Sequence, residues 1–224
     1  MTYPRCLFTV LLTACVCPFI NGQAGINIHD HLLIRDSNRY LYGSPEEKYE
    51  GSPYLNDEFQ TAYVYAGKMK FNGVPMRYNI HEDIMEYQER GQTFLLEPDP
   101  KITKIEMGNQ VFVVLPDAAN GFFELRYEGR LSLLSKMVIN YRKANYVTAV
   151  PAKYSRQDDV FYIIAPDRPA RKVTSLKQFL DYVNEKKDEL AQYAKAENLS
   201  FRRGEDILKL VKYHNALLDE TQNK

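Results

Sequence analysis

The sequence predicts a mainly β fold: an antiparallel meander that forms a sandwich or a partly open, barrel-like sheet, followed by C-terminal α-helices. Three observations support this fold class. Apolar and polar side chains alternate through 59–65, with the period of two that places one set on a buried face. Turn-forming residues recur between Phe59 and Tyr141 at the roughly 8–12-residue spacing typical of all-β sandwiches and barrels. At Ser175 the apolar period changes to that of a helix.

The first segment, 1–24, is predicted to be a signal peptide. It carries an early positive charge at Arg5 and an apolar run from Leu7 to Ile20 that is too short to span a bilayer. Small residues before Ala24 suit cleavage by signal peptidase. We therefore expect an exported protein, periplasmic or secreted, with no membrane span in the mature chain.

All three cysteines lie within this leader, at Cys6, Cys15 and Cys17. Cleavage after Ala24 would leave a mature chain without cysteine, which would exclude disulfides, thiol catalysis and cysteine-based zinc sites. An alternative interpretation treats 12–15, LTAC, as a bacterial lipobox. In that case a lipid on Cys15 would anchor the mature protein.

The segment 25–51 is polar and irregular, and we predict an extended N-terminal arm with one strand at 39–42. Its candidate for metal chemistry is the pair His29 and His31, which would share one face of a strand with Asp36 near by. A solvated chain end does not hold ligands in place, so we predict no metal site.

The segment 52–173 is predicted to be the antiparallel β domain. Its clearest local signal is Asn72-Gly73, because a type I′ hairpin turn needs positive φ at both central residues. We therefore predict a tight hairpin turn at this dipeptide. The alternating runs and turn residues between Asp159 and Val173 predict one last hairpin.

The segment 175–218 is predicted to be helical. An apolar stripe at Leu176, Phe179, Leu180 and Val183 has helical spacing, and Ser175 with Gln178 makes a capping box. The charged stretch 185–197 continues as helix, and a last helix is expected at about 205–218. His214 lies on its apolar stripe, so we predict a packed, hydrogen-bonded core residue and not a ligand. The pattern leaves open whether these helices pack on the sheet or dock a partner.

The composition and motifs limit the possible functions. Lys plus Arg equals Asp plus Glu at 29 each, so no overall charge favours nucleic acid. The chain has no phosphate-binding loop and no nucleophile elbow, and His81-Glu82 lacks the second histidine of a zinc-protease helix. We therefore name no catalytic, cofactor-binding or metal residue.

Two groups of side chains have alternative interpretations. Adjacent carboxylates fall in predicted turns, where solvation is the expected role, at Glu46/Glu47, Asp57/Glu58, Glu82/Asp83 and Asp158/Asp159. Tyrosines in the central runs favour cross-strand packing, but on an open face the same rings would stack on sugars or cover an apolar ligand. These are Tyr63, Tyr65, Tyr78 and Tyr87.

The runs VPMRYN at 74–79 and DIMEY at 83–87, with GFFEL at 121–125, carry a resemblance. They are similar to motifs of uncharacterised secreted or envelope proteins of Gram-negative bacteria, in which a VPLRYN-like strand recurs within a β-rich domain. This resemblance implies export and a β-rich body, and no known activity. We expect a non-enzymatic exported protein that binds a partner, glycan or lipid in the cell envelope. The alternative is a hydrolase whose carboxylates or histidines converge only in the fold.

Overall fold

The computed structural model describes Ile28, Leu32, 34–36, 49–115, 121–183 and 185–222. The predicted signal peptide at 1–24, the lipobox at Cys15, the pair His29 and His31, and the expected strand at 39–42 lie outside the described residues.

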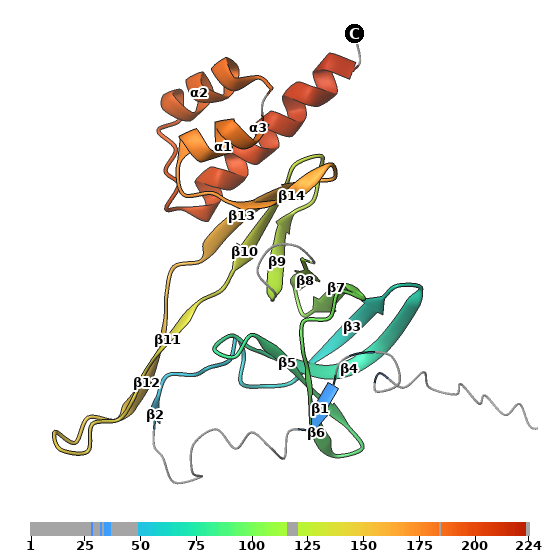
Figure 1. Ribbon diagram of the computed structural model, residues 1–224, viewed down its shortest axis with the longest axis vertical. Coiled ribbons are helices and arrows are strands. Elements are labelled where there is room, and N and C mark those ends of the chain that lie inside the picture. The colour runs from blue at the N-terminus through green and yellow to red at the C-terminus, as the bar shows by residue number, and fades with distance from the viewer. Residues whose placement is uncertain are drawn as a thin grey trace, which may run out of the picture.

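Within these residues the chain is mainly β with three C-terminal helices, as predicted (Figure 1). The first strands are β1 (Ile34–Asp36), β2 (Tyr49–Glu50), β3 (Gln60–Ala66), β4 (Met69–Asn79), β5 (Ile84–Glu89), β6 (Gln92–Leu96) and β7 (Ile102–Met107). The later strands are β8 (Gln110–Val114), β9 (Phe122–Tyr127), β10 (Ser132–Lys136), β11 (Ile139–Arg142), β12 (Ala152–Arg156), β13 (Val160–Ala165) and β14 (Arg168–Lys172). The helices are α1 (Leu176–Val183), α2 (Lys187–Ala196) and α3 (Gly204–Gln222).

Eleven strands form one open sheet in the order β1-β6-β5-β4-β3-β7-β8-β9-β10-β13-β14. Its neighbours are antiparallel, and most of them are consecutive in the chain, which is the predicted meander. The exceptions are the pairs β1–β6, β3–β7 and β10–β13. The second sheet is small, in the order β11-β12-β2, and its β2 strand runs parallel to β12.

The hairpin turn predicted at Asn72-Gly73 is wrong. The turn between β3 and β4 lies at Gly67-Lys68, and β4 runs on through Asn72 and Gly73. Ala62 pairs with Val74 and Val64 with Phe71, so two residues of β4 face one residue of β3. This arrangement is a β-bulge, and Gly73 adopts φ +67° within it. The dipeptide signals positive φ correctly, but a bulge meets that requirement as well as a turn does.

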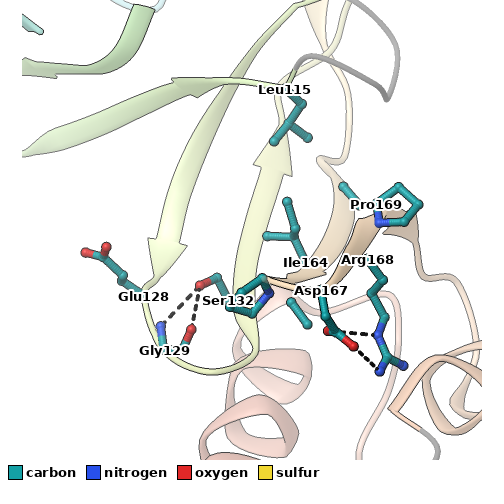
Figure 2. A pocket seen from close by; sticks show the side chains of 11 residues that line it. Leu115, Glu128, Gly129, Ser132, Ile164, Asp167, Arg168 and Pro169 are labelled. Carbon is teal, nitrogen blue, oxygen red and sulfur yellow. Dashed lines mark hydrogen bonds and ion pairs between the residues drawn. The ribbon is translucent and has the colours of Figure 1, made fainter. Parts of the chain in front are cut away.

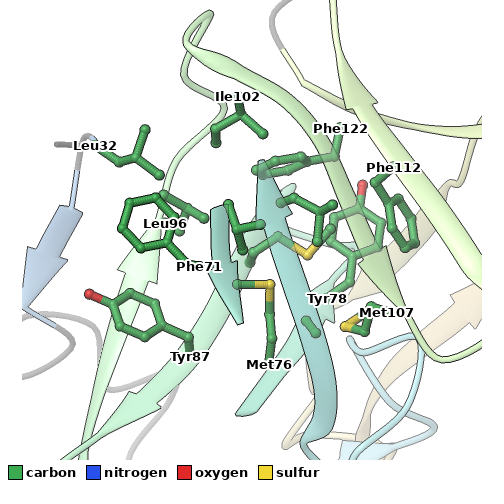
Figure 3. Close-up of a cluster of buried hydrophobic side chains, with 14 of the residues drawn as sticks. Leu32, Phe71, Met76, Tyr78, Tyr87, Leu96, Ile102, Met107, Phe112 and Phe122 are labelled. Atoms are coloured by element: carbon green, nitrogen blue, oxygen red, sulfur yellow. The ribbon is translucent and has the colours of Figure 1, made fainter. Parts of the chain in front are cut away.

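The sheet bends strongly around its main core. Tyr78 on β4 lies 6.1 Å, ring centre to ring centre, from Phe122 on β9, although three strands separate β4 from β9 in the sheet. At roughly 4.8 Å per strand a flat sheet would hold these rings about 19 Å apart. Figure 3 shows Tyr78 between Phe112 and Phe122, with Met76 and Met107 near by. The bend lets one sheet enclose its own apolar side chains.

The three helices pack against one end of the sheet and form a second core. Ile207, Leu210 and Val211 of α3 are buried with Leu133 of β10 and Ile163 of β13. Asn215 adds a two-point tie: its Nδ2 donates to the Leu131 carbonyl, and its Oδ1 accepts from the Leu131 N–H, each at 2.8 Å. The helical segment is therefore a brace on its own sheet.

The predicted helix start and the last predicted hairpin are both present. The Gln178 N–H donates to the Ser175 Oγ at 3.3 Å, and the Gln178 side chain accepts from the Thr174 N–H at 2.8 Å. Strands β13 and β14 form the hairpin expected between Asp159 and Val173. None of the helices among the described residues is both long and apolar enough to cross a membrane.

Candidate functional site

One long hairpin leaves the sheet and carries the most exposed apolar residues of the described chain. Strands β10 and β13 pair inside the large sheet, and their continuations β11 and β12 pair with each other outside it. We call residues 139–156, which comprise β11, its loop and β12, the hairpin arm. Figure 1 shows the hairpin arm running away from the helices, with its loop at the far end.

The loop of the hairpin arm is a closed turn. Asn145 and Val150 exchange two backbone hydrogen bonds, at 2.8 and 3.0 Å, which leave a four-residue loop from Tyr146 to Ala149. The Asn145 Oδ1 accepts hydrogen bonds from the Val147 and Thr148 N–H groups, at 3.1 and 3.2 Å. This side-chain cap satisfies loop donors that the strands cannot reach, so the loop has a defined shape.

Apolar exposure is concentrated on the small sheet. Tyr146 is 82% exposed and Val147 96% exposed at the tip, and Tyr49 of β2, which pairs with Ala152, is 53% exposed. Tyr63, at 39%, is the other exposed large apolar residue within the described part of the chain. Two large side chains therefore project together from the end of the hairpin arm, where they contribute little to the core.

The hairpin arm is also positively charged. It contains Arg142, Lys143, Lys153 and Arg156, and residues 138–157 include no acidic residue. Arg156 pairs with Asp159 at 2.5 Å at the root, and Lys153, which lies opposite Arg142, pairs with Glu50 at 3.1 Å. Within the described structure neither Arg142 nor Lys143 has an ion pair, and both are exposed. Free positive charge therefore lies next to the apolar tip.

The root of the hairpin arm is held by a cluster of rings. His81, from the turn between β4 and β5, lies 5.6 Å from Tyr141 of β11 and 5.3 Å from Tyr154 of β12, ring centre to ring centre. Tyr49 stands edge-on to Tyr154 at 5.4 Å. A side chain at Gly51 would collide with the Tyr154 carbonyl, so glycine allows β2 to approach β12 this closely. These ring contacts therefore pack the root of the hairpin arm against the β4–β5 turn and β2.

Two cavities flank the turn between β13 and β14. Figure 2 shows the larger, of about 630 Å³, with apolar Leu115, Ile164 and Pro169 facing it. Ser132 is the hydroxyl residue in its lining; its Oγ donates to the Gly129 carbonyl and accepts from the Gly129 N–H, both at 3.1 Å. The residues that line this cavity in the described structure include no histidine to activate that hydroxyl.

The second cavity, of about 450 Å³, lies between the turn and the helices and is lined in part by Asp167, Glu185 and His214. His214 is only 5% exposed, as predicted for a packed residue. The predicted hydrogen bond is absent: neither ring nitrogen has a partner among the described residues. Burial lowers the pKa of His214, with a smaller opposing effect from Glu185, so the neutral imidazole is favoured.

The carboxylate of Asp167 is held in an ion pair, which makes it a weaker base. Arg168 donates two hydrogen bonds to Asp167, at 3.1 and 2.8 Å, and this contact lowers the pKa of the carboxyl group. Arg168 also donates to the Tyr182 carbonyl at 2.7 Å. The Tyr182 hydroxyl in turn accepts from the Ala165 N–H and donates to the Pro169 carbonyl, so it acts as a structural bridge.

Asp83, which was expected to be solvated in a turn, is a structural residue. Its Oδ1 accepts from the Tyr78 hydroxyl at 2.6 Å, and its Oδ2 accepts from Lys136 Nζ at 2.5 Å. Lys136 also donates to the Phe122 carbonyl at 3.0 Å, so this cluster ties the β4–β5 turn to β9 and β10. Burial lowers the pKa of Lys136, and the nearby Asp83 opposes that shift. Turn position alone did not reveal these partners, because they come from distant strands.

The other predicted residues lie apart. Tyr78 and Tyr87 are buried, which confirms the packing interpretation for them, and the Tyr65 hydroxyl donates to Glu106 on the outer face. Asp57 and Glu58 are exposed, as expected of a solvated pair. The described residues hold no group of three or more His, Cys, Asp or Glu placed to bind a metal.

No family model matches the chain, and no curated protein or solved structure does. The hairpin arm was not singled out from the sequence. One signal in the sequence would have indicated it: Tyr146 and Val147 lie at the centre of the acid-free stretch 138–157, with Lys143 and Lys153 on either side.

Proposed function

We propose that the protein is a non-enzymatic, exported binding protein of the cell envelope and that the hairpin arm is its binding element. The observation that carries this proposal is the joint exposure of Tyr146 and Val147 at the end of a hairpin with a packed root. The leader-like segment 1–24 supports export.

The energetics of the tip support a binding role. Burial of apolar surface is worth about 25 cal/mol per Å², so a Val or Tyr side chain gains roughly 1.5–3 kcal/mol when a partner covers it. The tip residues gain little of this from folding, because most of their surface stays exposed. Tyrosine and arginine are also among the residues enriched at recognition surfaces.

A photo-crosslinking amino acid placed at residue 147 tests the proposal. In cells that make the protein, we expect crosslinked products from residue 147 well above those from residue 187. Lys187 is the control because it is also exposed but lies on α2, in the helical brace. Equal crosslinking from the two positions would show that the hairpin arm is not the binding element.

A hydrolase remains the second candidate, favoured by the cavity that Asp167, Glu185 and His214 line together. A neutral imidazole could act there as a general base toward a bound substrate. Screening the mature protein against ester, peptide and glycan substrates tests this candidate. Turnover that is lost in His214→Gln and kept in Tyr146→Ser would replace the binding proposal with an enzymatic one.

A further inference from the structure

We infer that the partner of the hairpin arm is an anionic phospholipid surface, into which Tyr146 and Val147 insert while Arg142 and Lys143 contact lipid phosphates. This inference rests on the proposed binding role of the hairpin arm. It adds the chemistry of the partner.

The order of side chains along the hairpin arm matches the layers of a membrane surface. Apolar side chains occupy the tip, and Arg142 and Lys143 follow three to four residues further back, at most roughly 13 Å along an extended chain. Interfacial elements bury their apolar face about 5–10 Å into the boundary between head groups and acyl chains. When the tip reaches that depth, flexible Arg and Lys side chains can extend to the phosphates.

The residue types at the tip also suit this interface. Tyrosine is enriched at membrane–water boundaries because its ring is apolar and its hydroxyl stays hydrated. Val147 is 96% exposed and supplies purely apolar surface. A protruding tip fits a deformable lipid surface, whereas a glycan would be better matched by a flat row of exposed rings, and the tip offers a single ring.

The charge distribution orients the hairpin arm toward an anionic surface. The whole chain is formally neutral, with 29 basic and 29 acidic residues. Residues 138–157 hold four basic residues and no acidic one, so the remainder of the chain carries four more acidic than basic residues. A negative bilayer therefore attracts the hairpin arm and repels the remainder of the chain, within a Debye length of about 8–10 Å.

The chain offers a background-free probe, because it contains no tryptophan. Tyr146→Trp places a single indole at the tip, and Tyr63→Trp places one on the exposed face of β3 as a matched control. With vesicles of phosphatidylcholine and phosphatidylglycerol, we expect a blue shift and quenching by bromine-labelled lipid tails for Tyr146→Trp. We expect neither effect for Tyr63→Trp.

Variants separate the apolar and the charged contributions by co-sedimentation with the same vesicles. We expect the double variant Arg142→Gln/Lys143→Gln to bind about 20–30-fold more weakly, since each basic residue near the surface contributes roughly fivefold. We expect Val147→Ser to weaken binding about tenfold. The matched control Lys187→Gln/Arg202→Gln removes two exposed charges from the helical region and should bind normally. Pure phosphatidylcholine vesicles should bind much less of the unchanged protein.

Two results would overturn the inference: no binding to anionic vesicles, or binding that the arm variants leave unchanged. If residue 147 crosslinks to a protein in cells while vesicles do not bind, the lipid inference fails and the hairpin arm remains the binding element. If residue 147 also crosslinks no more than residue 187, both proposals fail.

Discussion

At the scale of single residues, Gly73 tests the β-bulge in β4. It adopts φ +67°, and a side chain there would meet nothing within 4 Å. The cost of a substitution is therefore backbone strain without a steric clash. We expect Gly73→Val to lower the free energy of unfolding by about 1–3 kcal/mol, because β-branched residues strongly disfavour positive φ. Urea denaturation measures this change.

The matched control is Gly73→Asn, since asparagine tolerates the left-handed region far better than valine. This variant should lie much closer to the unchanged protein. Equal losses of unfolding free energy in Gly73→Val and Gly73→Asn would show that the positive φ at residue 73 does not determine the destabilisation.

The same position shows what local sequence can and cannot predict. Asn72-Gly73 signals a positive φ, and the structure has one at Gly73. Whether positive φ closes a turn or accommodates an extra residue depends on the pairing of β4 with β3, which involves residues about ten positions earlier. Gly67, with φ +57°, makes the turn instead. The sequence also indicates a break at Ala66-Gly67-Lys68, but Gly-Lys is a weaker hairpin signal than Asn-Gly.

Ionisation of Tyr78 makes the free energy of unfolding depend on pH in the alkaline range. Burial and the nearby Asp83 raise its pKa above the ordinary value near 10, so the folded protein keeps the phenol proton after the unfolded chain has lost it. The stabilisation is complete below pH 10 and is lost as the pH rises from 10 toward the folded pKa. Each pH unit in that range should cost about 1.4 kcal/mol for this residue.

Tyr78→Phe should remove the contribution of this residue to the pH dependence. The variant loses the hydrogen bond to Asp83, so we expect it to be about 1–3 kcal/mol less stable at neutral pH. Above pH 10 its stability should fall less steeply than that of the unchanged protein. Urea denaturation between neutral pH and pH 11 gives the free energy of unfolding of both proteins as a function of pH. Parallel curves above pH 10 would show that Tyr78 does not contribute to the pH dependence.

At the scale of secondary-structure elements, α3 is a structural brace and should resist exchange. Leu210 is fully buried in the core between the helices and β10. We expect Leu210→Ala to cost about 2–5 kcal/mol, and hydrogen exchange through 205–218 to be slow in the unchanged protein. The exposed Lys209→Ala is the matched control, expected within about 0.5 kcal/mol. Fast exchange through this segment would instead indicate a helix that is free to dock elsewhere.

The elements differ in how well their sequences reveal them. The stripe around Phe179 and the capping residues at Ser175 identify α1, because helix signals lie within one or two turns of chain. Residues 131–141 form one long, mostly apolar run in the sequence, but the structure divides it into β10 and β11, which belong to different sheets. The division falls where β10 and β13 leave the large sheet and continue as β11 and β12 in the small one. That point is set by neighbouring strands and not by the local sequence.

At the scale of the whole molecule, binding and folding occupy different parts of the chain. The core around Tyr78 and the core under the helices hold the fold, and the hairpin arm projects beyond both. Sequence periodicity indicates cores well, because buried faces repeat along a strand or helix. It indicates a binding tip poorly, because Tyr146 and Val147 look like two more strand residues until their exposure is known.

This separation predicts that the tip can be removed without unfolding the body. Asn145 and Val150 are already bonded as a hairpin pair, so the loop Tyr146–Ala149 can be replaced by Asn-Gly, the dipeptide suited to a two-residue turn. The replacement removes exposed side chains and the positive φ of Ala149, at +53°, and leaves the ring cluster at His81 in place. We expect the free energy of unfolding to stay within about 0.5 kcal/mol or to rise slightly.

The same variant should lose binding to anionic vesicles almost entirely, because the inserted apolar surface is gone while Arg142 and Lys143 remain. The residual binding should resemble that of a weak electrostatic contact and should disappear in high salt. Thermal unfolding and vesicle co-sedimentation on one preparation check both halves of the prediction. A stable variant that still binds would place the binding surface elsewhere, and a variant that unfolds would show that the tip supports the fold.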